Sequence, residues 1–129
     1  MVVVDTSVWI EYLRKKQEYV VFFETSLPKR ILIATSFVFG ELLQGCRKSS
    51  DADQILELYQ NLPHLNESDV WLEAGAISQK EKWFSAGVGL IDAALIVVAR
   101  RANVKVWSLD KKLKSVLKSS EIFDGLILG

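Results

Sequence analysis

Several residue types that would point to a particular class of protein are scarce in this chain. Cys46 is the only cysteine, which excludes an intrachain disulfide and a zinc cluster built on cysteines. No stretch approaches the roughly eighteen apolar residues of a membrane span. The first residues, 1–5, lack the basic region and long apolar run of a secretory signal. These absences predict a protein of a reducing, cytoplasmic compartment without a membrane anchor.

The chain also lacks an excess of either charge. It has 16 basic and 16 acidic residues, so its formal net charge is zero, whereas proteins that grip phosphate backbones usually carry a basic excess or stripe. Composition alone would therefore not suggest a nucleic acid as partner. The basic residues do cluster locally, and we interpret the clusters first as solvated helix faces: Arg14–Lys16, Arg47–Lys48, Arg100–Arg101, and the lysines at 111, 112, 114 and 118.

The chain is rich in apolar residues, and these form strand-like and helix-like patterns that alternate along the sequence. Its 129 residues, half of them hydrophobic, fit a single domain over 1–129. Short β-branched runs predict buried strands, and apolar residues at helical spacing predict helices between them. This alternation predicts a three-layer α/β/α fold around a central, mostly parallel sheet. The strands are expected at 2–4, 31–34, 104–107 and, as a short closing strand, 126–128; the helices are expected at about 6–16, 17–26, 35–45, 49–62, 68–86, 90–101 and 111–117.

Two acidic residues follow predicted strands directly. Asp5 comes after the first strand, and Asp110 lies just beyond the third. Ligands of open α/β sheets bind in the crevice outside the carboxyl ends of the strands, so both side chains can face one pocket.

Two further acids interrupt apolar surroundings. Asp92 lies in the run 89–99, where its neighbours are apolar or glycine, and an unpaired buried carboxylate normally shifts its pKa or finds a partner. A structural role at the start of a helix, where the dipole favours an acid, stays open for Asp92. Glu41 interrupts 37–45 in the same way, and taken alone it could be a solvent-facing helix residue.

Together the four acids predict a divalent-metal site. Carboxylates packed near one another repel, and a cation relieves the repulsion. Mg²⁺ and Mn²⁺ favour hard oxygen ligands, and Mg²⁺ usually retains several waters. A bound metal can make such a water a useful nucleophile and stabilise charge on a phosphoryl oxygen.

Four segments, in this order, resemble the motifs of PIN domains, and most closely those of VapC-type toxins of prokaryotic toxin–antitoxin pairs. Each motif is weak alone, but the ordered set covers nearly the whole chain. The segments are Val4–Ile10, Glu41–Gly45, Asp92–Ile96 and Ser108–Asp110.

The resemblance implies an endoribonuclease that uses Mg²⁺ or Mn²⁺, forms a homodimer and is held inactive by a small antitoxin. It implies Asp5 and Asp92 as metal ligands, with Glu41 and Asp110 completing the site directly or through water. The hydroxyls of Thr6 and Ser108 would orient these groups, although Thr6 is equally suited to cap a helix. The implied reaction is in-line attack of an activated water on an RNA phosphodiester, leaving a 5′-phosphate and a 3′-hydroxyl.

One departure from the family pattern concerns the site. Lys111 and Lys112 follow Asp110 where relatives often place a further acid, so a fifth carboxylate is missing, which weakens the case for a tightly held second metal.

Other interpretations of the same residues fit less well. A haloacid-dehalogenase phosphotransferase would need an aspartate where Ser7 stands, and a receiver domain would need paired acids after the first strand. A PIN fold that binds without cutting is the better alternative, although it would be expected to lose one of the four acids. We expect His64 in a surface loop, Cys46 as a small packing residue, and the four tryptophans in the core or an interface rather than stacked on bases.

Overall fold

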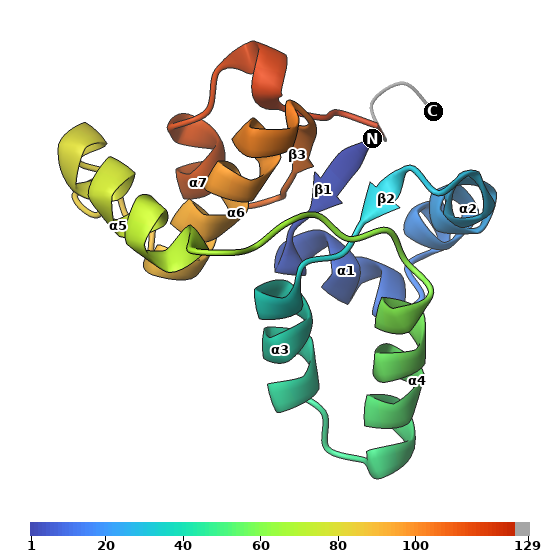
Figure 1. Cartoon of the computed structure of the whole chain (residues 1–129). Coiled ribbons are helices and arrows are strands. Elements are labelled where there is room, and N and C mark those ends of the chain that lie inside the picture. The colour runs from blue at the N-terminus through green and yellow to red at the C-terminus, as the bar shows by residue number, and fades with distance from the viewer. Residues whose placement is uncertain (126–129) are drawn as a thin grey trace.

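The computed structural model describes residues 1–125, and a three-stranded parallel sheet lies at its centre (Figure 1). Strand β1 (Val2–Val4) lies between β2 (Leu32–Ile33) and β3 (Lys105–Trp107). Val3 pairs with Ile33 on one side and Val106 on the other. The valines of β1 are all buried, as expected for the central strand of a parallel sheet. The parallel sheet predicted from the sequence is confirmed.

Helices follow each strand. Among the described residues they are α1 (Thr6–Leu13), α2 (Gln17–Ser26), α3 (Ser36–Gln44), α4 (Ser49–Gln60), α5 (Val70–Glu81), α6 (Leu90–Ala102) and α7 (Lys111–Ser115), with short 3₁₀ turns at Leu27–Lys29 and Ser119–Glu121. No helix within residues 1–125 is long and apolar enough to cross a bilayer.

The two faces of the sheet are covered by different helices. Trp107 of β3 packs on Phe22 and Phe23 of α2, with ring centroids 5.0 and 5.6 Å apart. Side chains alternate along a strand, so Val106 points to the opposite face, where α6 contacts β3 and β1. Residues 93–99 of α6 are all buried. Helices on both faces confirm the three-layer α/β/α architecture.

The tryptophans divide between core and surface. Trp9 is fully buried between Phe23 and Phe39, at 5.1 Å from each ring, and edge-to-face packing of this kind adds to the area buried. Trp83 and Trp107 are also buried, whereas Trp71 on α5 is half exposed. Of the core or interface position expected for the tryptophans, the core position is confirmed for three of the four.

Some elements are shorter than the sequence patterns predict. The strand expected at 31–34 keeps only Leu32 and Ile33. It ends before Ala34 because the N–H of Ala34 donates to the carbonyl of Pro63 at 3.1 Å, outside the sheet. The predicted closing strand at 126–128 lies outside the described residues.

The helix expected at 68–86 ends at Glu81. Lys82 adopts a left-handed conformation with φ 59°, and the N–H of Trp83 donates to the carbonyl of Ser78, which closes the helix as a C-terminal cap. The last predicted helix also ends early, at Ser115.

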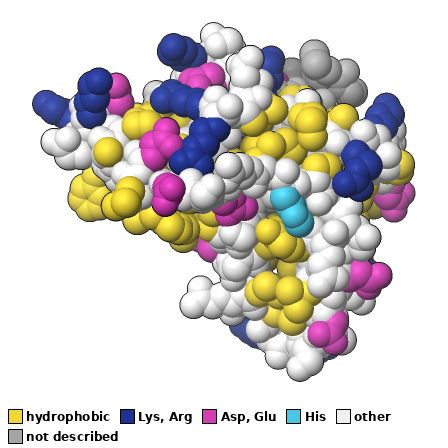
Figure 2. Space-filling view, in the orientation of Figure 1, with side chains coloured by type: hydrophobic (Ala, Val, Ile, Leu, Met, Phe, Trp, Pro, Cys, Tyr) yellow, Lys and Arg dark blue, Asp and Glu magenta, His cyan; other side chains and the backbone are white. Residues whose placement is uncertain are grey.

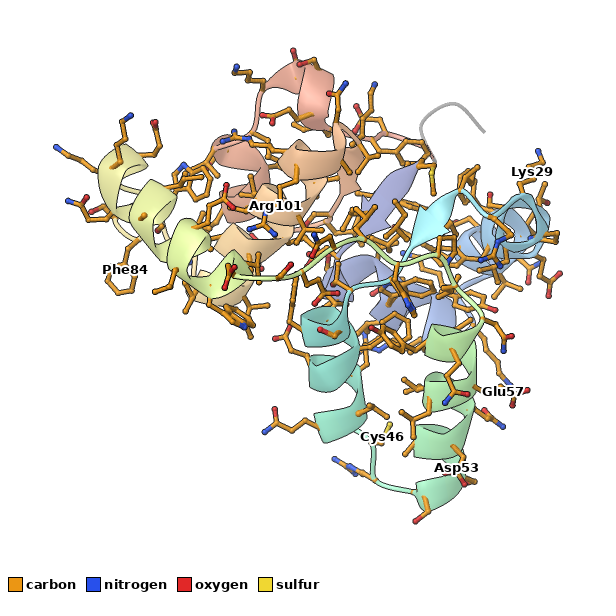
Figure 3. All side chains as sticks on the ribbon, viewed as in Figure 1. Lys29, Cys46, Asp53, Glu57, Phe84 and Arg101 are labelled. Carbon is orange, nitrogen blue, oxygen red and sulfur yellow. The ribbon has the colours of Figure 1, made fainter. Side chains whose placement is uncertain are left out.

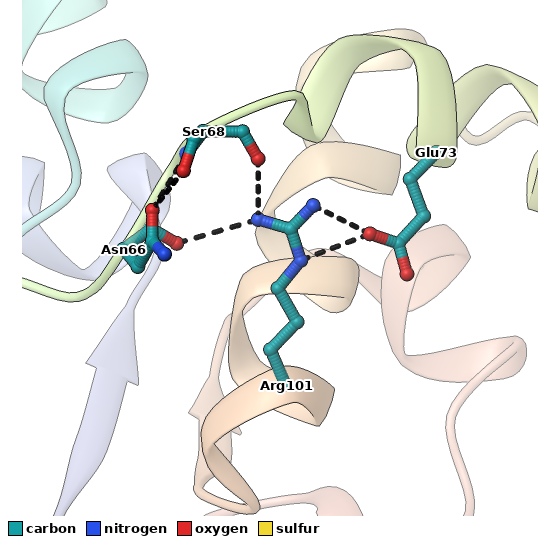
Figure 4. A network of polar contacts seen from close by, with 4 residues as sticks. All are labelled: Asn66, Ser68, Glu73 and Arg101. Atoms are coloured by element: carbon teal, nitrogen blue, oxygen red, sulfur yellow. Dashed lines mark hydrogen bonds and ion pairs between the residues drawn. The ribbon is translucent and has the colours of Figure 1, made fainter.

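The segment between α4 and α5 is fastened to α6 by one arginine (Figure 4). The guanidinium of Arg101 donates to the carbonyl of Ser68 at 2.8 Å and, from Nε, to Oε2 of Glu73 at 2.9 Å. Arg100 pairs with Glu121, with Nε and Oε2 2.7 Å apart. These two arginines are therefore ion-paired and not the solvated helix face expected from the sequence.

Arg101→Gln should destabilise the fold because it leaves the carbonyl of Ser68 and the carboxylate of Glu73 without their donor. We expect the free energy of unfolding to fall by about 1–3 kcal/mol, measured by urea titration. Arg14→Gln is the matched control, since Arg14 is exposed and pairs only with Glu11 at 3.8 Å, so its loss should cost less than about 1 kcal/mol. Equal losses in the two variants would contradict a fastening role for Arg101.

Candidate active site

Asp5 lies at the carboxyl edge of the sheet, immediately after the central strand. Its N–H donates to the carbonyl of Trp107 at 2.9 Å, which extends the pairing of β1 with β3 by one residue. Asp5 is therefore level with Ser108, and its carboxylate is buried, with 6% of the residue exposed. Oδ2 of Asp5 accepts hydrogen bonds from the hydroxyls of Ser7 at 2.8 Å and Ser108 at 2.7 Å.

The two serine hydroxyls connect Asp5 to the loop after β3. Oγ of Ser7 accepts from the N–H of Leu109, and Oγ of Ser108 accepts from the N–H of Asp110, each at 3.0 Å. Each hydroxyl thus donates to the carboxylate of Asp5 and accepts from a backbone N–H of the loop after β3. The sequence analysis assigned Ser108 an orienting role but missed Ser7. Ser7 could have been identified from its position, because its hydroxyl lies two residues after Asp5, the carboxylate at the end of the first strand.

Asp110 has a structural function that the sequence analysis did not predict. It is the N-cap residue of α7, and its Oδ1 accepts from the N–H groups of Lys112 at 2.8 Å and Leu113 at 3.4 Å. Such a cap uses one carboxylate oxygen to satisfy free N–H groups at the helix start.

Glu41 is held by Thr6 across the gap between α1 and α3. The hydroxyl of Thr6 donates to Oε1 of Glu41 at 2.9 Å. The N-cap of α1 is Asp5, and Thr6 is the first residue inside the helix. The alternative role of Thr6 as a helix cap is therefore wrong, because its hydroxyl is directed to Glu41.

Asp92 lies in the first turn of α6, three residues after the N-cap Gly89. Burial is the main cause that raises the pKa of its carboxyl group, and repulsion by the carboxylates of Asp5, Asp110 and Glu41 adds to it; together they raise the pKa from 3.8 to about 6. The other three acids singled out in the sequence thus all act electrostatically on Asp92.

The oxygen atoms of this cluster are only partly used by the protein. Asp5, Glu41 and Asp110 each commit one oxygen to hydrogen bonds, and within residues 1–125 the second oxygen of each accepts none. None of the four acids forms an ion pair with a basic residue of this part of the chain. The cluster is a concentration of negative charge that the described residues do not neutralise.

The chemistry of this donor set fits a hard divalent cation. As the side chains are oriented here, however, no three acids, histidines or cysteines of residues 1–125 are close enough together to hold one ion. Electrostatic repulsion reaches further than direct ligation, and the protein's own donors hold three of the carboxylates in place. A bound ion would therefore reach some of them through water, as is usual for Mg²⁺.

His64 and Cys46 have the structural positions that the sequence analysis expected. His64 is exposed, its ring stacks on Tyr59 at 4.2 Å, and its Nε2 is 2.7 Å from the carbonyl oxygen of Tyr59. Cys46 is half-buried and packs against the core. The surface position expected of His64 and the packing role expected of Cys46 are both confirmed.

Known proteins resemble this chain over nearly its full length. The model of the PIN domain family matches residues 2–118. Ribonuclease VapC32 of Mycobacterium tuberculosis is 31% identical over 125 residues, which cover 95% of this chain and 94% of that protein, in each of two strains.

Two solved structures share the fold. A toxin–antitoxin complex from Klebsiella pneumoniae contains a chain that superposes with a TM-score of 0.70 at 14% identity, covering 95% of this chain and all of that one. The crystal structure of FitAcB from Neisseria gonorrhoeae gives a TM-score of 0.61 at 13% identity, covering 95% and 94% of the two chains. At these identities the structural likeness concerns the fold alone.

Ser108→Ala should destabilise the protein, because it leaves the buried Oδ2 of Asp5 with one donor fewer and the N–H of Asp110 without an acceptor. The expected loss in free energy of unfolding is about 1–3 kcal/mol, measured by chemical denaturation. Ser115→Ala is the matched control, since that hydroxyl donates only to the carbonyl of Lys112 and its loss should cost less than about 0.5 kcal/mol. A Ser108 variant as stable as the control would show that the serine bridge contributes nothing.

Asp92→Asn should stabilise the metal-free protein near neutral pH. The folded chain binds the Asp92 proton more tightly than the unfolded chain does, so the charge penalty is present above the folded pKa of about 6 and disappears as the pH falls toward 3.8. In EDTA at about pH 7.5 we expect a gain of about 1–2 kcal/mol after allowance for partial exposure, or roughly 3–10 °C in Tm. At about pH 5 the gain should shrink.

The control for this measurement is Asp53→Asn on α4, which removes an exposed carboxylate that lies in no cluster and should leave Tm nearly unchanged at both pH values. An unchanged or lower Tm for Asp92→Asn near neutral pH would instead indicate that the carboxylate stabilises the first turn of α6.

Proposed function

The chain belongs to the PIN-domain family, and on that premise we propose that it is a metal-dependent endoribonuclease, the toxin of a VapBC-type toxin–antitoxin pair. The observation that carries the proposal is the cluster of Asp5, Glu41, Asp92 and Asp110. Burial, and then the charges of the other three acids, raise the pKa of Asp92, and no basic residue of the described chain pairs with any of the four. The likeness to a protein named as a ribonuclease supports the choice of substrate.

The proposed cofactor is Mg²⁺ or Mn²⁺. The oxygens available to it are both those of Asp92 and the second oxygen of each of the other three acids. When bound, such an ion supplies a Lewis acid for a phosphoryl oxygen and a more acidic water. Its positive charge would also relieve the repulsion among the carboxylates.

The chain's own residues keep the acids in position for this chemistry. The hydroxyls of Ser7 and Ser108 fix Oδ2 of Asp5, and the hydroxyl of Thr6 fixes Oε1 of Glu41. Orientation of this kind lowers the entropic part of an activation barrier. Hydrolysis adds water across the phosphodiester bond and leaves a 5′-phosphate and a 3′-hydroxyl, and it requires no nucleophile from the protein.

We further propose that a small antitoxin inhibits this activity, that the chain forms a homodimer, and that it acts in the cytoplasm. The fold shared with the toxin–antitoxin complex of Klebsiella pneumoniae supports an inhibitory partner. Hydrophobic side chains gather along the lower edge of α5 (Figure 2), and Phe84, in the turn after it, is 84% exposed (Figure 3). An apolar surface of this kind suits coverage by a second copy.

The purified protein, free of antitoxin, should cut structured RNA in Mn²⁺ and fail to cut it in EDTA. Asp5→Asn and Asp92→Asn should each lower the rate by at least about a hundredfold, because each removes a carboxylate from the metal site. Asp53→Asn and Glu57→Gln are matched controls: both acids are exposed on α4 (Figure 3) and neither acts on the pKa of Asp92, so both variants should cut at the wild-type rate.

Mn²⁺ binding provides a second measurement that does not require turnover. Mn²⁺ should raise the Tm of the wild type and of the α4 controls but raise it less in the Asp5 and Asp92 variants. Cleavage that persists in both site variants would remove the proposed site. Failure of the wild type to cut RNA under any of these conditions would favour a PIN fold that binds without cutting.

A further inference from the structure

A groove of about 920 Å³ leads away from the candidate active site. It is bordered by α1, α3 and α4, which lie together below the sheet (Figure 1). Thr6 and Glu41, which form the hydrogen bond at the edge of the acid cluster, line it. The groove therefore meets the acid cluster at Glu41, and a chain that lies in the groove reaches this edge of the cluster.

Four basic side chains also line this groove. Arg14 and Lys15 come from the end of α1, and Arg47 and Lys48 come from the loop between α3 and α4. All four residues are exposed. Arg14 makes a long ion pair with Glu11, at 3.8 Å, and the other three pair with no acid within residues 1–125. Two of the basic clusters that the sequence analysis assigned to solvated helix faces thus meet at one groove.

We propose that the groove holds single-stranded RNA on its way to the acid cluster, with Arg14, Lys15, Arg47 and Lys48 contacting the phosphates. The inference rests on the proposed nuclease function and identifies where its substrate binds. A chain with zero net charge needs a local concentration of cations to hold a polyanion, because phosphate contacts supply most of the affinity for nucleic acid. The groove has four such cations in its lining, together with Glu41 of the acid cluster.

The apolar part of the groove lining favours one strand over a duplex. Apolar side chains such as Ile10, Leu42 and Leu58 line the groove together with the cations. In a duplex the flat faces of the bases are stacked on one another, whereas a single strand can present its bases to an apolar or aromatic surface. A segment of a partner protein could also cover an apolar wall, but four cations against the acids Glu41 and Asp51 favour a polyanion.

The first experiment measures RNA binding without cleavage. The probe is a short fluorescein-labelled RNA, used as a single strand and as a duplex of the same sequence. Each form is titrated with the wild type and with Arg47→Ala/Lys48→Ala, in EDTA and at several salt concentrations. We expect the double variant to bind the single strand at least about tenfold more weakly at low salt. The slope of log K against log salt should become shallower by about 1.4, since each lost phosphate contact removes about 0.7.

The matched control is Lys29→Ala/Lys80→Ala. Both lysines are exposed, unpaired within the described residues and outside the groove, and this variant removes the same charge. It should bind RNA with the wild-type affinity and salt slope. Equal weakening in the two double variants would show a non-specific charge effect and would overturn the inference.

Cys46 gives a readout of where the RNA lies. It lines the groove beside Arg47, is half-buried and is the only cysteine of the chain (Figure 3). Single-stranded RNA should slow the alkylation of Cys46 by iodoacetamide severalfold in the wild type and in the control variant, but not in Arg47→Ala/Lys48→Ala. Alkylation that RNA does not slow, in a wild type that binds RNA, would overturn the inference.

The remaining outcomes separate this inference from the proposed function. A wild type that cuts RNA, together with an Arg47/Lys48 variant that binds and cuts equally well, would refute the groove and leave the nuclease intact. Tighter binding of the duplex than of the single strand would also refute it. If the variant binds RNA normally but no longer binds a protein inhibitor, the groove is a protein site. A wild type that neither binds nor cuts RNA would refute the nuclease and the groove together.

Discussion

Repulsion among four carboxylates is opposed, at the edge of this sheet, by a small number of hydroxyl and amide donors. Ser7 and Ser108 hold Asp5, Thr6 holds Glu41, and the first turn of α7 holds Asp110. Asp92 has no hydrogen-bond donor among the described residues, and its pKa is raised by burial and then by the charges of the other three acids. The protein thus maintains an unneutralised cluster of negative charge, which costs stability and which the proposed metal ion would relieve.

The serine bridge also explains why the site is well defined although the strands are very short. β2 has two residues and β3 has three, so backbone pairing alone fixes little of the edge. The two serine hydroxyls bind the end of β1 to the loop after β3 through side-chain contacts, and each satisfies a backbone N–H at the same time. A network in which every member is paired is more rigid than its individual bonds suggest.

Sequence patterns predicted most of this architecture because strands and helices depend mainly on residues close together in the sequence. The β-branched run of β1 and the apolar run of α6 could be identified directly, and the position of Asp5 after a strand was enough to place it at the sheet's edge. The patterns failed where a distant partner decides the outcome. Ala34 leaves the sheet because Pro63 accepts its N–H, and Thr6 turns from its own helix toward Glu41, thirty-five residues away in sequence. The groove was equally hidden, because its two basic clusters are far apart in the chain and meet only in the fold.

The pairing of β1 with its neighbours has a consequence for which changes the chain can tolerate. Asp5 faces α6 because it follows Val4 in an alternating strand, and Val4 is paired with Trp107, whose ring packs on α2. An insertion or deletion of a single residue in β1 would exchange the two faces. The carboxylate would then enter the aromatic layer formed by Phe22, Phe23 and Trp107 and lose both serines. Loops such as the one joining α3 to α4 can change length without this penalty, whereas the three valines before Asp5 act as a spacer of fixed length.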